Sequence, residues 1–358
     1  MTSTATAEQL AERIFDGAIV SMEQLSISLG VQLGLYQALA SGDRHARQLA
    51  EAAGIHPRYA REWLEQQAVA GILTVAEDNA DPYQRTFSLP PAYRSVLLDA
   101  DHPLFLATLP GFIASFAQVL PQLAVAFRTG EGVAYEAYGA PTRHGIAGMN
   151  QPMYRNDLAG WIATLPDIEK RLQTGGAVLD LGCGTGGSSI ALARQFDRVR
   201  VHGVDLDAAS VAEANEQIGA SGLSGRVSFT RADAASLPPP AELYDLVCVF
   251  ESLHDMADPV GALRAVRSQL SPGGAVLIAD ERVAEHFGAP GDQVERLNYS
   301  FSVLHCLPAT RAEGTSVEAG TVLRPDTVRE YAAQAGYAGC TVLPIENDLW
   351  RFYRLDPA

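Results

Sequence analysis

The sequence predicts an α/β fold, in which a mainly parallel sheet follows a mostly α-helical region. An apolar run at Ala177–Leu179 leads into a glycine-rich turn and a helical pattern, the usual start of a nucleotide-binding half. Two alternating segments, 339–345 and 349–355, close the chain and predict an antiparallel pair of strands. Four further apolar runs alternate with helical stretches, as in parallel sheets. They lie at 198–204, 227–231, 243–250 and 275–280.

Composition limits the class of protein. The chain has 358 residues, 47% of them hydrophobic, which is enough for two domains with sizeable cores. The net charge of -16 argues against a nucleic-acid partner. The four cysteines lie far apart without metal-binding spacing, so we expect reduced thiols, no metal site and no disulfide. The N-terminus has no signal-peptide pattern and no apolar run is long enough to span a bilayer, so we expect a cytoplasmic protein without a membrane partner.

We expect three parts in the chain: residues 1–95, 96–173 and 174–358. In the first part, Gly54 ends one short helix and Pro57 opens the next, which is the helix–turn–helix pattern of a winged helix. Eleven acidic residues outnumber seven arginines there, so DNA binding is disfavoured and dimerisation favoured.

The second part, residues 96–173, reads as a helical connector and lid. Prolines punctuate its apolar first half, and aromatic, methionine and amide side chains gather in its second half. Such side chains suit the wall of a small-molecule pocket, and we assign Met153 and Tyr154 to it. Core packing between domains is the alternative for the same residues.

The third part opens with Asp180, Gly182, Gly184 and Gly186. The glycines permit a sharp turn and close approach of a ligand. The same spacing would suit a dinucleotide, whose pyrophosphate binds at a helix N-terminus. The Asp180 carboxylate would repel that pyrophosphate but would favour a cationic ligand without phosphate, and S-adenosylmethionine is such a ligand.

The stretch Ala177–Ser189 resembles the glycine motif of class I S-adenosylmethionine-dependent methyltransferases. The whole chain resembles small-molecule O-methyltransferases with an N-terminal winged helix that forms a homodimer. Tyr299–Pro308 and Val342–Leu355 resemble a bacterial subgroup that includes mycobacterial proteins. The resemblance implies a seven-stranded Rossmann-like sheet with an antiparallel last strand.

Cofactor-binding residues are expected at successive strand ends. Asp205 follows the second predicted strand at the spacing of an acid that binds ribose hydroxyls. A helix cap is the alternative, although Asp207 fits that role better. From the resemblance, Asp233 accepts from the adenine amino group, and Leu206 and Ala234 flank the ring. Phe250 stands where the family has a cofactor-contacting lysine.

His254 is the best candidate for a general base, because its ordinary pKa lies near neutrality. Its Leu-His-Asp context resembles the O-methyltransferase motif whose histidine is the catalytic base, although Met256 replaces the tryptophan of that motif. Asp280 falls at the position of an acid that orients this histidine. Residues 282–324 read as a long irregular loop, which supplies Tyr299 and His305 to the substrate pocket, with His305 as the reserve base.

The sequence therefore predicts an S-adenosylmethionine-dependent methyltransferase that acts on a small molecule, most simply at a hydroxyl. Two alternatives remain open. The first is an enzyme that binds the same cofactor without transferring its methyl group, since fold does not fix function. The second is a ligand-responsive DNA-binding regulator built on the winged helix.

Overall fold

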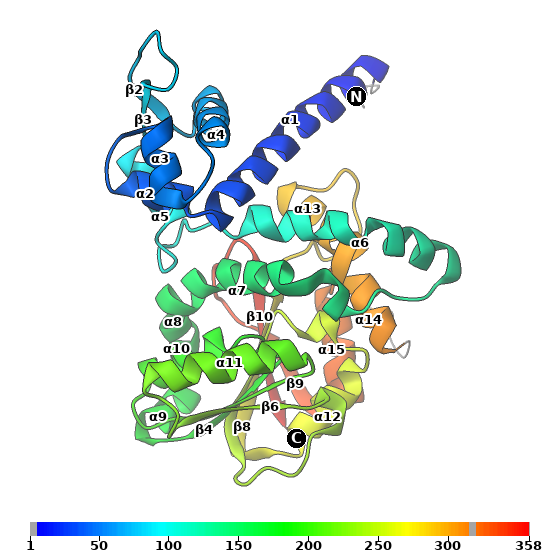
Figure 1. The fold of residues 1–358 in the computed structure, drawn as a ribbon. Coiled ribbons are helices and arrows are strands. Elements are labelled where there is room, and N and C mark those ends of the chain that lie inside the picture. The colour runs from blue at the N-terminus through cyan, green and yellow to red at the C-terminus, as the bar shows by residue number, and fades with distance from the viewer. Residues whose placement is uncertain (1–5, 315–319, 358) are drawn as a thin grey trace. The chain divides into compact units, whose positions relative to one another are not determined.

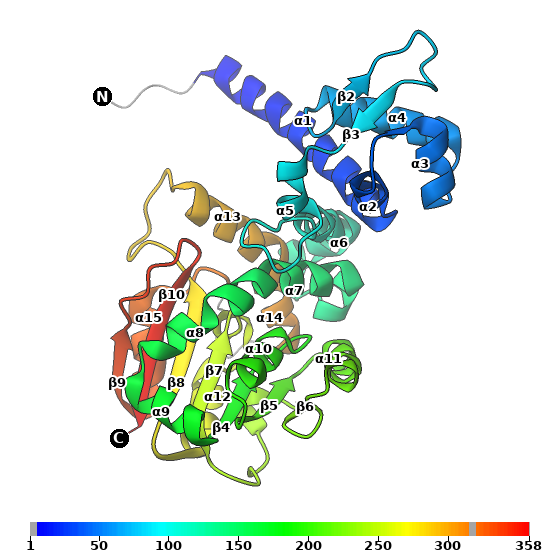
Figure 2. The same cartoon turned by 90° about the vertical axis from the view of Figure 1, so that its left-hand side faces the viewer.

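The computed structural model describes residues 6–314 and 320–357 and divides into two compact units (Figures 1 and 2). One unit holds the chain through Ser115 together with His144–Pro152. The other holds Phe116–Arg143 together with the chain from Met153 onward. Residues 96–173, which we expected to form one connector, therefore contribute to both units.

The first unit contains the winged-helix elements. A three-stranded sheet in the order β1-β3-β2 packs with α3 and α4, and β2 and β3 form the wing. Gly54 ends α3 in the left-handed conformation, as expected for a C-terminal glycine. The elements are α1 (Ala7–Gln32), α2 (Leu35–Ala40), β1 (Arg44–His45), α3 (Ala46–Ala53), α4 (Pro57–Val69), β2 (Thr74–Glu77), β3 (Thr86–Ser88) and α5 (Arg94–Leu97).

Two helices are long and apolar enough to cross a membrane, judged by length and composition alone: α1 and α6 (Leu109–Thr129). The sequence predicted no span of this length. The core helices of soluble proteins can have the same length and composition, and 39% of the apolar stretch of α6 is buried. Only 11% of the apolar stretch of α1 is buried, so this helix exposes an apolar surface.

The second unit is a seven-stranded sheet in the order β6-β5-β4-β7-β8-β10-β9. The pairs from β6 to β8 are parallel, whereas β10 runs antiparallel to both β8 and β9. This arrangement confirms the predicted fold class and closing hairpin. The strands are β4 (Ala177–Leu181), β5 (Arg200–Asp205), β6 (Val227–Arg231), β7 (Tyr244–Phe250), β8 (Leu270–Glu281), β9 (Tyr337–Val342) and β10 (Trp350–Pro357).

Helices cover both faces of this sheet (Figure 2). One core forms between the sheet and α8–α11, and the other between the sheet and α12 and α15. The central strands are apolar on both faces because both faces are buried. These helices are α8 (Leu158–Ala163), α9 (Pro166–Thr174), α10 (Gly187–Gln195), α11 (Ala208–Ser221), α12 (Pro259–Arg267) and α15 (Pro325–Gln334). Helix α7 (Gly139–Asn156) contributes residues to both units.

The stretch 282–324, expected to be irregular, is largely helical where it is described. Helix α13 (Gln293–Phe301) continues through a π-helical turn, η5 (Ser302–Cys306), into α14 (Leu307–Glu313). The side chain of Asp292 starts α13 by accepting from the Glu295 backbone N–H at 2.8 Å. A π-helical turn between two helices often marks a functional site.

Candidate active site

The glycine turn between β4 and α10 has the conformation expected from its sequence. Gly182, Gly184 and Gly186 all have positive φ angles, of 73°, 52° and 85°. A Cβ at Gly186 would lie 2.5 Å from the ring of Phe229, so no other residue fits there without movement. At Gly184 nothing lies within 4 Å of that position, which leaves the tip of the turn open.

Asp180 is buried at the end of β4, with 1% of its surface exposed. Its Oδ2 accepts hydrogen bonds from the hydroxyls of Ser188 and Ser189, at 2.5 and 2.6 Å. Burial raises its pKa. The carboxylate thus ties the strand to the first turn of α10, in addition to placing an acid behind the glycine turn.

Asp205 ends β5 and receives two backbone N–H groups. Its Oδ2 accepts from Gly184 and its Oδ1 from Asp207, both at 2.8 Å. Asp207 is the residue that caps α11, by accepting from the Ser210 N–H. The helix-cap alternative for Asp205 is therefore not the one that the structure has. Burial raises the pKa of Asp205 to about 6.

The other cofactor candidates divide into two groups. Leu206 is 40% exposed beside the end of β5, while Asp233 and Ala234 follow β6, with Ala234 in the short helix η3 (Ala234–Ser236). The Asp233 side chain accepts from the Ala235 N–H at 2.9 Å. Phe250, in contrast, is 4% exposed and packs its ring in the core, so its side chain is not open to a ligand.

His254 and Asp280 form a buried pair where β7 and β8 end. His254 Nδ1 lies 2.8 Å from Asp280 Oδ1, and the side chains are 2% and 1% exposed. His254 belongs to a single 3-10 turn, η4 (Leu253–Asp255), shortly after β7. Asp280 Oδ1 also accepts the N–H of Glu281, which fixes the carboxylate.

The second nitrogen of His254 faces a different group. His254 Nε2 lies 3.3 Å from Asp255 Oδ1, and its side chain also hydrogen bonds with Cys306. Burial disfavours the charged imidazole, but the two nearby carboxylates outweigh burial and raise the pKa of His254 well above its ordinary value. Burial lowers the pKa of the nearby His305 and so disfavours its charged form.

Two acids near the pair were not predicted. Glu281 is 7% exposed and hydrogen bonds with Glu251. Burial and the charge of Glu251 raise the pKa of Glu281 well above its ordinary value. Glu251 has a φ of 51°, a left-handed conformation that costs a non-glycine residue roughly 1–3 kcal/mol. Glu251 directly follows β7, and an acid at the end of a parallel strand could have been recognised in the sequence as a candidate site residue.

The predicted pocket residues do not form one group. Met153 and Tyr154 pack against the sheet core, where the Tyr154 ring lies 5.9 Å from that of Phe250. Tyr299 lies on α13 and accepts from Arg324 at 3.2 Å. Of the four, His305 is the residue whose electrostatic partners include His254.

Aromatic rings surround His305. Its ring centroid lies 4.7 Å from Tyr138, 5.5 Å from Tyr135 and 6.0 Å from Phe116. The Tyr138 hydroxyl donates to the Leu304 carbonyl at 2.8 Å, which holds the π-helical turn against this cluster. An apolar, flat acceptor suits such surroundings.

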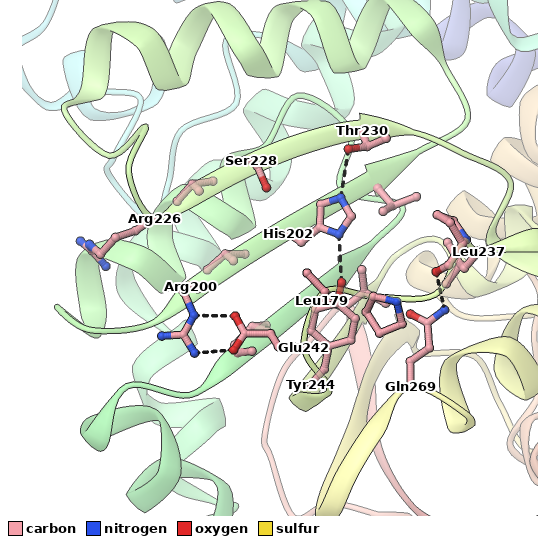
Figure 3. A pocket seen from close by; sticks show the side chains of 18 of the residues that line it. Leu179, Arg200, His202, Arg226, Ser228, Thr230, Leu237, Glu242, Tyr244 and Gln269 are labelled. Atoms are coloured by element: carbon pink, nitrogen blue, oxygen red, sulfur yellow. Dashed lines mark hydrogen bonds and ion pairs between the residues drawn. The ribbon is translucent and has the colours of Figure 1, made fainter.

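A cavity of about 390 Å³ lies elsewhere on the sheet, over β4, β5 and β6 (Figure 3). Its centre is His202, whose ring nitrogens hydrogen bond with Tyr244 and Thr230 at 2.9 and 3.0 Å. The residues 237–242 border it on one side. Its described lining includes none of the predicted site residues, so this cavity is separate from the candidate active site.

Two regions of the chain match models of known protein families. Residues 178–274 match the family model of a methyltransferase domain, and residues 21–98 match an Rv2258c-like winged helix-turn-helix domain. The chain therefore combines a methyltransferase domain with an N-terminal winged helix.

Individual relatives agree with this class. A 27-O-demethylrifamycin SV methyltransferase of Amycolatopsis mediterranei is 37% identical over 30% of this chain and 40% of its own. The ubiquinone/menaquinone biosynthesis C-methyltransferase UbiE of Geobacter sulfurreducens is 29% identical over 46% of this chain and 62% of its own. The chain thus spans less than two thirds of these relatives.

A solved structure extends the likeness to the whole chain. Human N-acetylserotonin methyltransferase, in complex with S-adenosylmethionine, covers 100% of both chains with a TM-score of 0.72. At 16% identity this likeness shows the fold alone.

Proposed function

We propose that this protein transfers a methyl group from S-adenosylmethionine to a hydroxyl of a small molecule, with His254 as the general base. The observation that carries the proposal is the buried His254–Asp280 pair, 2.8 Å apart, at the ends of β7 and β8. A carboxylate on Nδ1 fixes the ring and leaves Nε2 to take a proton. Asp280 is therefore a positioning residue.

The residues at the neighbouring strand ends fit the cofactor. The open tip of the turn at Gly184 admits a ligand, and Asp205 offers carboxylate oxygens at the edge of β5. Asp180, Gly182, Gly186, Leu206, Asp233 and Ala234 complete the proposed cofactor site. The bound cofactor supplies a methyl group on a positively charged sulfur.

The acceptor reacts as follows. The acceptor hydroxyl would take the place of Asp255 beside His254 Nε2, and that nitrogen would accept the hydroxyl proton while the bound cofactor supplied the methyl group. The products are a methyl ether, S-adenosylhomocysteine and a protonated His254, whose charge Asp280 balances. The positive charge of the cofactor, held near the ends of β7 and β8, would lower the pKa of His254 and so free Nε2 to accept the proton.

His305 is part of the proposed acceptor pocket, with the aromatic rings around it. Tyr299, Met153 and Tyr154 are proposed pocket residues on their residue types and their places in the chain. The electrostatic link to His254 makes His305 the stronger candidate of the four.

The test is product mass and formation of S-adenosylhomocysteine with a panel of aromatic and aliphatic alcohols. His254→Ala should lower the rate by about two to four decades with cofactor affinity preserved. His202→Ala is the matched control, because His202 lies in the separate cavity. A product without an added methyl group would favour the cofactor-binding, non-methylating alternative. If His305→Ala rather than His254→Ala abolishes the rate, His305 is the base.

We also propose a homodimer formed through the N-terminal unit. Large apolar side chains along α1 and its end are 40–68% exposed, a surface that soluble proteins usually cover with a partner. They are Leu10, Ile14, Phe15, Ile19, Val20, Met22, Leu25, Leu29 and Leu33. Light scattering tests this proposal. The absence of nucleic-acid binding and a cytoplasmic location remain predictions.

A further inference from the structure

The further inference concerns three side chains that meet on the side of His254 away from Asp280. His254, Asp255 and Cys306 each offer one potential metal-binding atom, and these atoms all lie within 4.8 Å of one another. The first two come from η4 and the third from η5, 51 residues further along the chain from Asp255. Spacing in the sequence did not reveal this group; only the fold brings the thiol to the histidine.

The separation of the nitrogen and oxygen ligands suits a tetrahedral zinc ion, and each of the three atoms lies within 4.8 Å of the other two. Zinc binds nitrogen and oxygen at about 2.0–2.2 Å and sulfur at about 2.3 Å, which places a nitrogen and an oxygen ligand roughly 3.3 Å apart. His254 Nε2 and Asp255 Oδ1 are 3.3 Å apart. Imidazole, carboxylate and thiol are all ligands that zinc accepts, and three protein ligands leave one position open.

Two further observations point to a cation here. Metal-binding histidines almost always donate their other ring nitrogen to a carboxylate or carbonyl, and His254 Nδ1 is paired with Asp280 in this way. Among the described residues, the buried Asp255 Oδ1 has no hydrogen-bond partner of good geometry. In the metal-free site the imidazole of His254, 3.3 Å away, is the group that balances this carboxylate, and a bound zinc ion would take over that role.

We propose that His254 Nε2, Asp255 Oδ1 and Cys306 Sγ form a zinc-binding site, and that zinc bound there inhibits methyl transfer by occupying the nitrogen of the base. The inhibition rests on the proposed function, whereas the binding does not. Cys306 loses its thiol proton to solvent as the sulfur–zinc bond forms, and His254 Nε2 releases any proton it carries. No electron is transferred, and a chelator reverses the binding.

The binding test uses the full-length protein without any acceptor. Calorimetry should show one zinc ion per chain, with at least one proton released to the buffer. Cobalt serves as an optical probe, because a thiolate ligand gives it a charge-transfer band in the near ultraviolet. Magnesium, which prefers oxygen ligands, should not bind.

Two cysteine variants test whether zinc binds at this site or elsewhere on the protein. Cys306→Ser should weaken zinc binding by at least roughly 100-fold and remove the cobalt band. Cys340→Ser is the matched control, because Cys340 lies on β9 and is not one of the three ligands. Circular dichroism and binding of S-adenosylhomocysteine check that both variants fold. Zinc affinity unchanged in Cys306→Ser, or a cobalt complex without a thiolate band, would overturn the site.

The inhibition test compares rates with and without zinc once an acceptor is known. Zinc should raise the apparent KM for the acceptor and leave affinity for S-adenosylhomocysteine unchanged, and a chelator should restore the rate. Zinc that binds without changing the rate would overturn the inhibitory role. If metal-free protein makes no methylated product, the proposed function fails while the binding result still stands.

Discussion

The substitution Asp280→Asn tests the proposed mechanism most directly, because it removes a charge while keeping the shape. The oxygen of the introduced amide can still accept from His254 Nδ1 and from the Glu281 N–H, as the carboxylate does at 2.8 and 2.9 Å. The amide nitrogen would take the place of Oδ2, which has no hydrogen-bond partner among the described residues. The main change is therefore the loss of the negative charge opposite His254 Nδ1.

The size of the effect follows from that lost charge. A hydrogen bond to a charged group is worth about 1.5–3 kcal/mol. In the proposed step the charge of the bound cofactor lowers the pKa of His254, so the imidazole becomes charged only as it accepts the proton. Since about 1.4 kcal/mol corresponds to one decade, kcat should fall by about one to two decades. Asp280→Ala also frees the ring to turn, so its rate should approach that of His254→Ala.

The assay measures kcat for each variant at saturating cofactor, with affinity for S-adenosylhomocysteine as the check on folding. Asp280→Ala leaves His254 buried without its partner and should also lower the free energy of unfolding by roughly 3–5 kcal/mol. Rates in Asp280→Asn equal to wild type would show that charge balance at His254 plays no part in catalysis.

Three further predictions concern the cofactor site and the dimer. Burial raises the pKa of Asp205 to about 6, and its ionised form is the one proposed to accept the ribose hydroxyls. Affinity for S-adenosylhomocysteine should therefore fall as pH drops below 6, and calorimetry should find this dependence absent in Asp205→Asn. Gly186→Ala should lower thermal stability more than Gly184→Ala, because its Cβ meets Phe229 at 2.5 Å whereas Gly184 has open space; equal losses would contradict the steric argument. Ile14→Glu should dissociate the dimer in light scattering, while Val69→Glu, on α4, should not; a monomeric wild type would remove the basis of this prediction.

Local patterns in the chain were sufficient for the fold class. The apolar strands, the glycine turn and the closing hairpin were all visible because each depends on residues close in sequence. The turn glycines have the positive φ angles that their residue type permits. The pairing of His254 with Asp280 was expected from the resemblance, and the ends of adjacent parallel strands do bring them together.

Other features depend on the side chains that meet across the fold, and no local pattern contains them. Asp180 binds the serines of α10, and the ring of Phe250 packs in the core because the helices of that face cover it. The supposed loop 282–324 proved largely helical, and its π-helical turn carries Cys306 to His254. The sequence by itself determined the sheet, the turn and the candidate base, since these follow from residues near one another. The surroundings of His254 were decided by the tertiary structure alone, because burial and charge depend on neighbours that are distant along the chain.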